Sequence, residues 1–154
     1  MKAFLEWSTG HLNQAGIDSP RMEAEVLLAR ALQLCREELY CKPERILSEA
    51  EKSISRDLID RRVRREPVAY ILGRKEFWSL DFKITPDVLI PRPDSETLIE
   101  AARDVFAGNP PRRIADLGTG SGALLLAALR VFPQAEGIGV DASAAALAVA
   151  RGNA

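Results

Sequence analysis

The chain has 154 residues, of which 47% are apolar, and its 21 basic and 22 acidic side chains give a formal net charge of −1. This composition is typical of a globular protein, and the balanced charge excludes a whole-chain field that would attract nucleic acid or an anionic membrane. No apolar run approaches the roughly 18 residues that cross a bilayer. Glu6 lies where a signal peptide would need an apolar residue. We therefore expect a cytoplasmic protein that binds neither nucleic acid nor membrane directly.

The sequence offers few residues that could bind a metal ion. It has two cysteines, Cys35 and Cys41, and one histidine, His11, and these do not form any usual zinc-binding pattern. We predict no metal site. The cysteines are expected to be reduced and mostly buried as small apolar side chains, and His11 to lie on a helix surface or half-buried.

Residues 1–73 are predicted to form a helical domain. Apolar residues recur at helical spacing in residues 4–15 and again in residues 24–35, where Cys35 lies on the apolar face. Ser48 and Glu51 match a capping box at the start of a further helix, which should end before Pro67. The basic run RRVRR (61–65) is interpreted as a solvated helix face; the alternative is a contact with an acidic partner.

Residues 74–93 are predicted to form a connector of short strands and stiff, proline-rich chain. EFWSLDF (76–82) is rich in aromatic residues and alternates in part, which favours one or two strands. Three prolines then follow within eight residues, 86–93. We expect Phe77 and Trp78 to seal the junction between the two parts of the chain. The segment IPRPDSE (90–96) has two interpretations: a place at the mouth of an active site, with Arg92 or Glu96 near the substrate, or a brace between domains.

Residues 94–154 are predicted to begin an α/β domain. A helix over 95–107, with Leu98, Ala102 and Val105 on one face, precedes a strand over 113–117, a glycine turn and a helix over about 121–131. A second strand ends at Asp141 and a further helix begins after it. The expected fold class is α + α/β: a helical domain, the connector, and the first βαβ unit of an incomplete Rossmann-like domain. NPP (109–111) lies in a loop before the glycine turn.

The glycine turn DLGTGSGA (116–123) predicts a nucleotide-type ligand. Gly118, Gly120 and Ala123 fit the dinucleotide fingerprint, and Asp141 follows at the end of the next strand, where it suits two ribose hydroxyls. Asp116 favours a different ligand, because its carboxylate would repel a pyrophosphate but suits the ammonium and sulfonium groups of S-adenosylmethionine. The sequence therefore favours S-adenosylmethionine over a nicotinamide dinucleotide.

Four segments in this order resemble one family. REPVAYILG (65–73), EFWSLDF (76–82), LIPRPDSE (89–96) and DLGTGSGA (116–123) are similar to the release factor glutamine methyltransferases, the PrmC/HemK family. The resemblance implies a class I methyltransferase that transfers a methyl group from S-adenosylmethionine to the glutamine nitrogen in the GGQ motif of peptide chain release factors. It places the cofactor at Gly118, Thr119, Gly120, Ser121, Gly122 and Asp141, with Asp116 near the methionine ammonium.

The resemblance also implies parts that these residues do not contain. The family's catalytic motif, N-P-P-Y, is absent, so no catalytic residue is assigned, and two parallel strands with three helices should leave apolar faces uncovered. We expect an N-terminal fragment that transfers no methyl group alone and binds cofactor weakly. The helical domain would help dock a release factor near the ribosome. The alternatives are the related enzyme of ribosomal protein L3, a non-catalytic module that docks on a release factor or the ribosome, and, more distantly, a nicotinamide enzyme.

Overall fold

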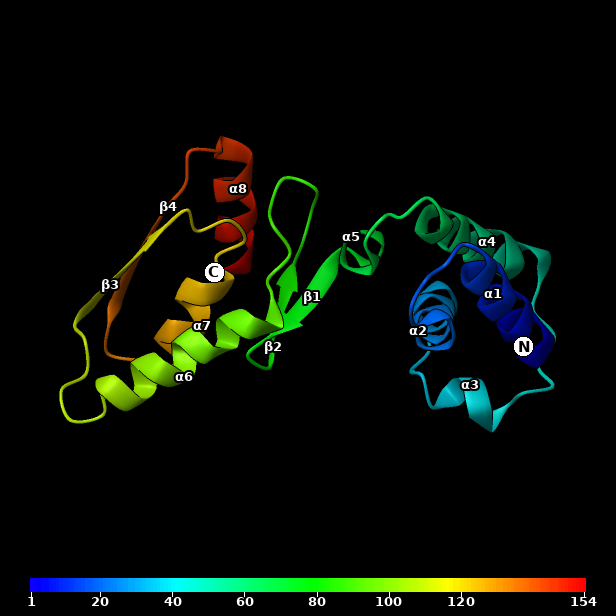
Figure 1. The fold of residues 1–154 in the computed structure, drawn as a ribbon, viewed down its shortest axis with the longest axis horizontal. Coiled ribbons are helices and arrows are strands. Elements are labelled where there is room, and N and C mark those ends of the chain that lie inside the picture. Colours follow the sequence, from blue (N-terminus) through cyan, green and yellow to red (C-terminus); the bar gives the residue numbers. More distant parts are fainter. The chain divides into compact units, whose positions relative to one another are not determined.

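The computed structural model describes residues 1–154, which divide into two compact units, Met1–Leu72 and Gly73–Ala154 (Figure 1). The first unit is entirely helical, and the second combines two small sheets with helices. The strand-and-proline segment predicted as a separate connector is grouped with the second unit. No helix in the chain combines the length and apolar character needed to cross a membrane.

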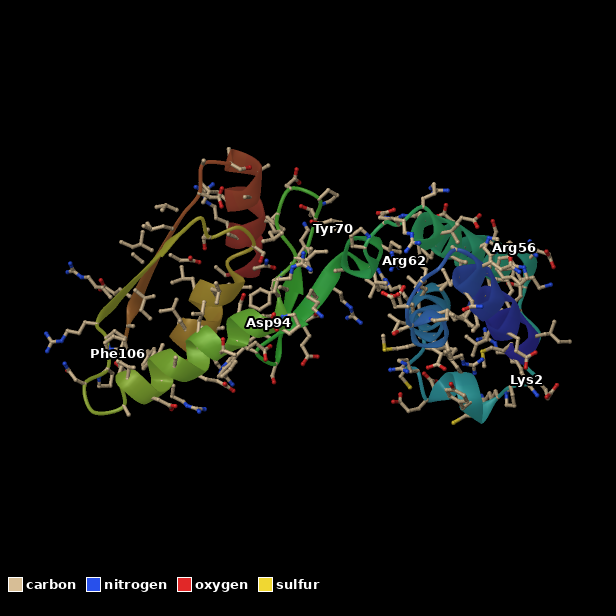
Figure 2. All side chains as sticks on the ribbon, viewed as in Figure 1. Lys2, Arg56, Arg62, Tyr70, Asp94 and Phe106 are labelled. Carbon is tan, nitrogen blue, oxygen red and sulfur yellow. The ribbon has the colours of Figure 1, made fainter.

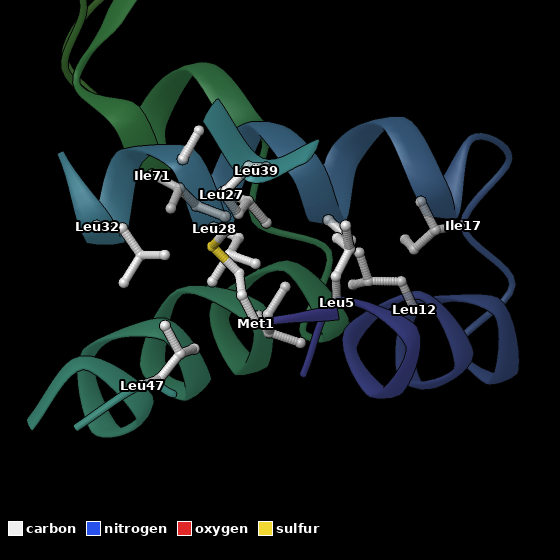
Figure 3. Close-up of a cluster of buried hydrophobic side chains, with 13 residues drawn as sticks. Met1, Leu5, Leu12, Ile17, Leu27, Leu28, Leu32, Leu39, Leu47 and Ile71 are labelled. Carbon is white, nitrogen blue, oxygen red and sulfur yellow. The ribbon is translucent and has the colours of Figure 1, made fainter. Parts of the chain in front are cut away.

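The first unit consists of five helices: α1 (Lys2–Gln14), α2 (Pro20–Leu32), α3 (Glu38–Cys41), α4 (Glu49–Val63) and α5 (Val68–Leu72). Figure 3 shows its core, with Leu12, Leu27 and Leu28 among the labelled residues. These three side chains and Ile59 of α4 are almost fully buried. These residues lie at the helical spacing seen in the sequence, because residues three or four apart fall on one face of a helix. Each buried leucine or isoleucine contributes about 1.5–3 kcal/mol of apolar burial.

The predicted capping box begins α4. Ser48 accepts a hydrogen bond from the backbone N–H of Glu51 at 3.2 Å, and the Glu51 carboxylate accepts one from the backbone N–H of Ser48 at 2.9 Å. Two backbone donors that the first turn would otherwise leave free are thereby satisfied. The predicted capping box is therefore confirmed. It could be predicted from the sequence because its two residues are only three positions apart.

The basic run at the end of α4 makes contacts inside the first unit. Arg61 pairs with Glu66, Arg62 with Glu23, and Arg65 donates to the carbonyls of Ala15 and Gly16, at 2.7 and 3.1 Å respectively. Figure 2 labels Arg62 at this end of the unit. Arg62 and Arg65 therefore tie the end of α4 to the start of α2 and to the residues after α1, and most of the run is not a free solvated face.

Both cysteines are exposed, so the prediction that they are buried is wrong. The reason is the end of α2: the helix stops at Leu32 and Gln33 takes a left-handed conformation, φ 55°. Cys35 therefore lies beyond the apolar face that the sequence assigned to it. Cys41 ends the short helix α3, of which only Leu39 is buried. His11 is half-buried as expected; its ring stacks on that of Trp7, with 5.2 Å between centroids.

The second unit begins with an antiparallel hairpin, β1 (Arg74–Phe77) and β2 (Leu80–Lys83), whose ring pair Phe77 and Phe82 is buried. A 3-10 turn (Pro93–Ser95) leads into α6 (Glu96–Val105). Then follow β3 (Arg113–Leu117), α7 (Ala123–Val131), β4 (Glu136–Val140) and α8 (Ala144–Asn153). Strands β3 and β4 pair in parallel, so the predicted βαβ unit is present.

One face of the parallel pair is covered and the other is open. Figure 1 shows α6, α7 and α8 to one side of β3 and β4, and α7 packs on both strands. The side chains that alternate to the opposite face include Leu117, Ile138 and Val140, which are 82%, 62% and 45% exposed. Parallel strands are usually buried on both faces, so the predicted uncovered face is confirmed.

The apolar face predicted for α6 is wrong in part. Ile99 is buried as the helix packs against α7, whereas Leu98 and Val105 are 60% and 74% exposed. The short helix has apolar residues on more than one side, and its spacing alone does not decide which side meets a neighbour. Phe106, labelled in Figure 2, follows the helix and meets the ring of Phe132 edge-on.

Candidate cofactor-binding site

The candidate site lies where the two parallel strands end. β3 ends at Leu117 and the glycine turn, residues 118–122, follows; β4 ends at Val140 and Asp141 follows. Because parallel strands present their carboxyl ends at the same edge, the two segments meet there, which is the usual ligand position in open α/β sheets. The structure thus brings together all six residues predicted to bind cofactor.

Glycine is required in the turn by backbone conformation. Gly118 and Gly120 have φ angles of 84° and 54°, in the left-handed region that other residues rarely adopt. A Cβ built on either of them would meet no atom within 4 Å. The space beside these two residues is therefore open to a ligand.

Most backbone N–H groups of the turn are already bound within the protein. Gly118 and Thr119 both donate to the carbonyl of Val140, at 2.8 and 2.9 Å, and Gly122 donates to the carbonyl of Thr119 at 2.8 Å. Gly120 donates to Asp141 Oδ2 at 2.9 Å. Four of the five turn amides are used, so the turn has few donors left for phosphate oxygens, which such loops bind through free N–H groups.

Asp141 is held by the backbone on both sides. Its Oδ2 accepts from Gly120, and its Oδ1 accepts from the backbone N–H of Ser143 at 2.9 Å. The bonds from Ser143 and Gly120 keep the pKa of the Asp141 carboxyl below its ordinary value. A carboxylate has about four lone-pair sites, so Asp141 retains acceptor capacity for at least one further donor.

Asp116 lies beside the turn, where the sequence places it. Its Oδ2 accepts a hydrogen bond from Thr119 Oγ1 at 2.8 Å. With Gly118 and Gly120 it lines a cavity of about 120 Å³. A drug-sized ligand needs about 300–1,000 Å³, so this cavity accommodates only part of a molecule of that size. A separate hollow of about 390 Å³ is lined by Asp141 together with residues of α7 and α8.

The segment before α6 also lines the small cavity. Leu89, Ile90, Pro91, Arg92 and Ser95 line it together with the turn, and Phe77 of the hairpin lines it too. Glu96 faces elsewhere: its Oε1 accepts from the backbone N–H of Trp78 at 2.8 Å. Arg92 therefore lies at the candidate site, and Glu96 braces the hairpin within the second unit.

One residue at the site was missed by sequence reasoning. Asn153, the last residue of α8, donates from Nδ2 to the carbonyl of Ser121 at 2.9 Å. The two residues are 32 positions apart, and no motif in the sequence links them. Their contact follows only from the packing of α8 against the turn.

Comparison with known proteins identifies the relatives of this chain. Residues 3–73 match the family model of the PrmC N-terminal domain. Over its whole length, the chain is 44% identical to the release factor glutamine methyltransferase of Aliivibrio fischeri. It is 43% and 46% identical to the proteins of the same name from Caulobacter vibrioides and Bradyrhizobium diazoefficiens, with 93% of the chain aligned in each case.

The chain is a relative of the release factor glutamine methyltransferases. The resemblance found in the sequence is thereby confirmed. The chain spans about half the length of the curated relatives it matches, 54% of the Aliivibrio protein and 50% of the Caulobacter protein. The glycine turn and Asp141 lie within the stretch shared with the Aliivibrio methyltransferase.

Proposed function

We propose that the second unit is the beginning of a Rossmann-like class I methyltransferase domain that binds S-adenosylmethionine. The observation on which this depends is the pairing of the glycine turn with Asp116 in one cavity. A carboxylate there suits the ammonium and sulfonium groups of S-adenosylmethionine, and it would repel a pyrophosphate in a partly desolvated site.

The charges around the small cavity support the methionine end of this cofactor. Asp116 offers a carboxylate to the ammonium group, and Arg92 offers a guanidinium to the carboxylate of the same amino acid. The first-turn N–H groups of α7, which no side chain caps, add positive potential at the end of the turn. We assign this cavity to the methionine moiety and leave the ribose hydroxyls to Asp141.

The proposed reaction is methylation of the glutamine side-chain nitrogen in release factors. The names of the relatives favour release factors over the ribosomal protein L3 alternative. An amide nitrogen is a poor nucleophile, so catalysis depends on holding it against the methyl group. Residues 1–154 contain no N-P-P-Y motif to do so, and we assign to this stretch the cofactor half of the site and, in residues 1–73, a docking surface for the release factor.

Cofactor binding is tested by titrating the chain with S-adenosylmethionine and following the backbone amides of Gly118 and Gly120 by NMR. We expect saturable shifts at these glycines with affinity weaker than micromolar, and loss of the shifts in Asp116→Asn and Asp141→Asn. NADH serves as the control ligand. Shifts caused by NADH and not by S-adenosylmethionine would refute the assignment of the cofactor.

Methyl transfer is tested separately with radiolabelled S-adenosylmethionine and a release factor. We expect no transfer from residues 1–154 alone. We expect transfer when they are joined to the remaining half of the Aliivibrio relative, and none when the acceptor glutamine is replaced by alanine. An inactive chimera that binds cofactor and release factor normally would favour a non-catalytic docking module.

A further inference from the structure

Asn153 uses its whole side-chain amide to join three segments of the second unit. Its Nδ2 donates to the carbonyl of Ser121 at 2.9 Å and to the carbonyl of Lys83 at 3.1 Å. Its Oδ1 accepts from the backbone N–H of Lys83 at 2.8 Å. An amide has two donor hydrogens and one acceptor oxygen, so both donors and the oxygen are engaged. The paired bonds to Lys83 imitate those that a neighbouring strand would make at the end of β2.

The bond to Ser121 fixes the cofactor turn from the α8 side. Ser121 is 3% exposed, and its carbonyl precedes Gly122, whose φ angle is 81°. Gly120, the residue before Ser121, is held by Asp141. Asp141, three residues before α8, and Asn153, the last residue of α8, thus bind two consecutive residues of the turn, one through its N–H and one through its C=O.

Close packing supports this contact independently. A Cβ built on Gly122 would lie 3.5 Å from the Cβ of Ala150, so α8 lies directly against the turn. A turn with three glycines loses much conformational entropy when it is ordered. A hydrogen bond that holds the turn before the ligand arrives lowers the part of that cost that binding would have to supply.

We infer that Asn153 is a positioning residue for the cofactor site: it holds the Ser121 carbonyl and so keeps the glycine turn in its binding conformation, without touching the cofactor itself. This inference rests on the proposed function. It adds a link from the hairpin to the cofactor turn, because the same amide binds Lys83.

The test compares Asn153→Ala and Asn153→Asp with Asn109→Ala as a matched control, since Asn109 is exposed in the same unit. Each chain is titrated with S-adenosylmethionine by NMR. We expect a five- to tenfold loss of affinity in both Asn153 variants and a change of less than twofold in Asn109→Ala. Asn153→Asp keeps an acceptor for Lys83 but points a carboxylate at the two carbonyls.

Two further readouts separate positioning from general stabilisation. The amide nitrogen shift of Gly122 reports the hydrogen bond on the preceding carbonyl, and it should change in both variants before ligand is added. Hydrogen exchange at the Lys83 amide should accelerate in Asn153→Ala and stay slow in Asn153→Asp. An affinity loss in Asn153→Asp with a protected Lys83 amide would support positioning of the turn.

The possible failures are distinct. If the parent chain is folded and does not bind S-adenosylmethionine, the proposed cofactor site is wrong, and the positioning role of Asn153 is refuted as well. If the parent chain binds and the folded Asn153 variants bind within twofold of it, the inference alone is wrong. If both variants unfold the second unit, Asn153 is a structural residue and the positioning role is refuted.

Discussion

Replacing Gly139 with alanine tests how tightly β4 supports the glycine turn. A Cβ on Gly139 would lie 2.9 Å from Thr119 Oγ1 and 3.1 Å from Thr119 Cβ and Cγ2. Carbon atoms pack best at about 3.5–4.0 Å, so Thr119 must move by roughly half an ångström. That movement displaces the turn at its second residue and strains the 2.8 Å hydrogen bond from Thr119 to Asp116.

The expected cost is about 2 kcal/mol of unfolding free energy in the second unit. Overpacking costs about 1–3 kcal/mol, and a lost hydrogen bond adds about 1 kcal/mol when Thr119 cannot keep its partner. With a urea slope of about 1–2 kcal/mol per molar for a unit of this size, the midpoint should fall by roughly 1–2 M. The affinity for S-adenosylmethionine should fall as well, because Thr119 belongs to the proposed site.

Fluorine NMR of labelled tryptophan measures this effect unit by unit, because Trp7 lies in the first unit and Trp78 in the second. The urea transition reported by Trp78 should shift in Gly139→Ala. Gly108→Ala is the matched control in the same unit, since a Cβ there would meet nothing within 4 Å. An unchanged transition in Gly139→Ala, or one shifted as little as in the control, would show that Thr119 can move away without cost. The predicted overpacking against Thr119 would then be refuted.

Three further predictions concern other parts of the chain. Ser48→Ala removes the capping box and should destabilise the first unit by about 1 kcal/mol. Urea unfolding followed at Trp7 measures this loss, and Ser53→Ala, at an exposed position of the same helix, should cause none. Equal losses in the two variants would contradict the role of the cap. Folding lowers the pKa of Asp141, so the stability that this carboxylate contributes is present above its ordinary pKa and is lost as pH falls through the lowered value. Acid titration should therefore shift the NMR signal of the Gly120 amide in the parent chain and leave it unshifted in Asp141→Asn. Leu117→Gln on the open sheet face should change the unfolding free energy by less than about 0.5 kcal/mol, and a loss above 2 kcal/mol would mean that this face is covered in solution.

Local motifs were predictable because their partners are near in the sequence. The capping box of Ser48 and Glu51, the glycine turn after β3 and the strand before Asp141 were all located from the sequence. The burial of residues on α6 was not, since Leu98 and Ile99 are both apolar and only the neighbouring α7 selects Ile99. Cys35 was assigned wrongly because the left-handed conformation of Gln33 ends α2 early, and no glycine at this position indicates such a turn in the sequence.

The kind of site that we propose could be predicted from the sequence, because the chemistry of a glycine turn with Asp116 before it and Asp141 after the next strand follows from residue type and spacing. The further groups that surround the candidate site became clear from the packing of the folded chain. Arg92 comes to the cavity from the proline-rich segment, and Asn153 reaches Ser121 across 32 residues and Lys83 across 70. Such contacts depend on how separate elements pack, and a hydrogen bond between distant residues leaves no periodic pattern in the chain that makes it.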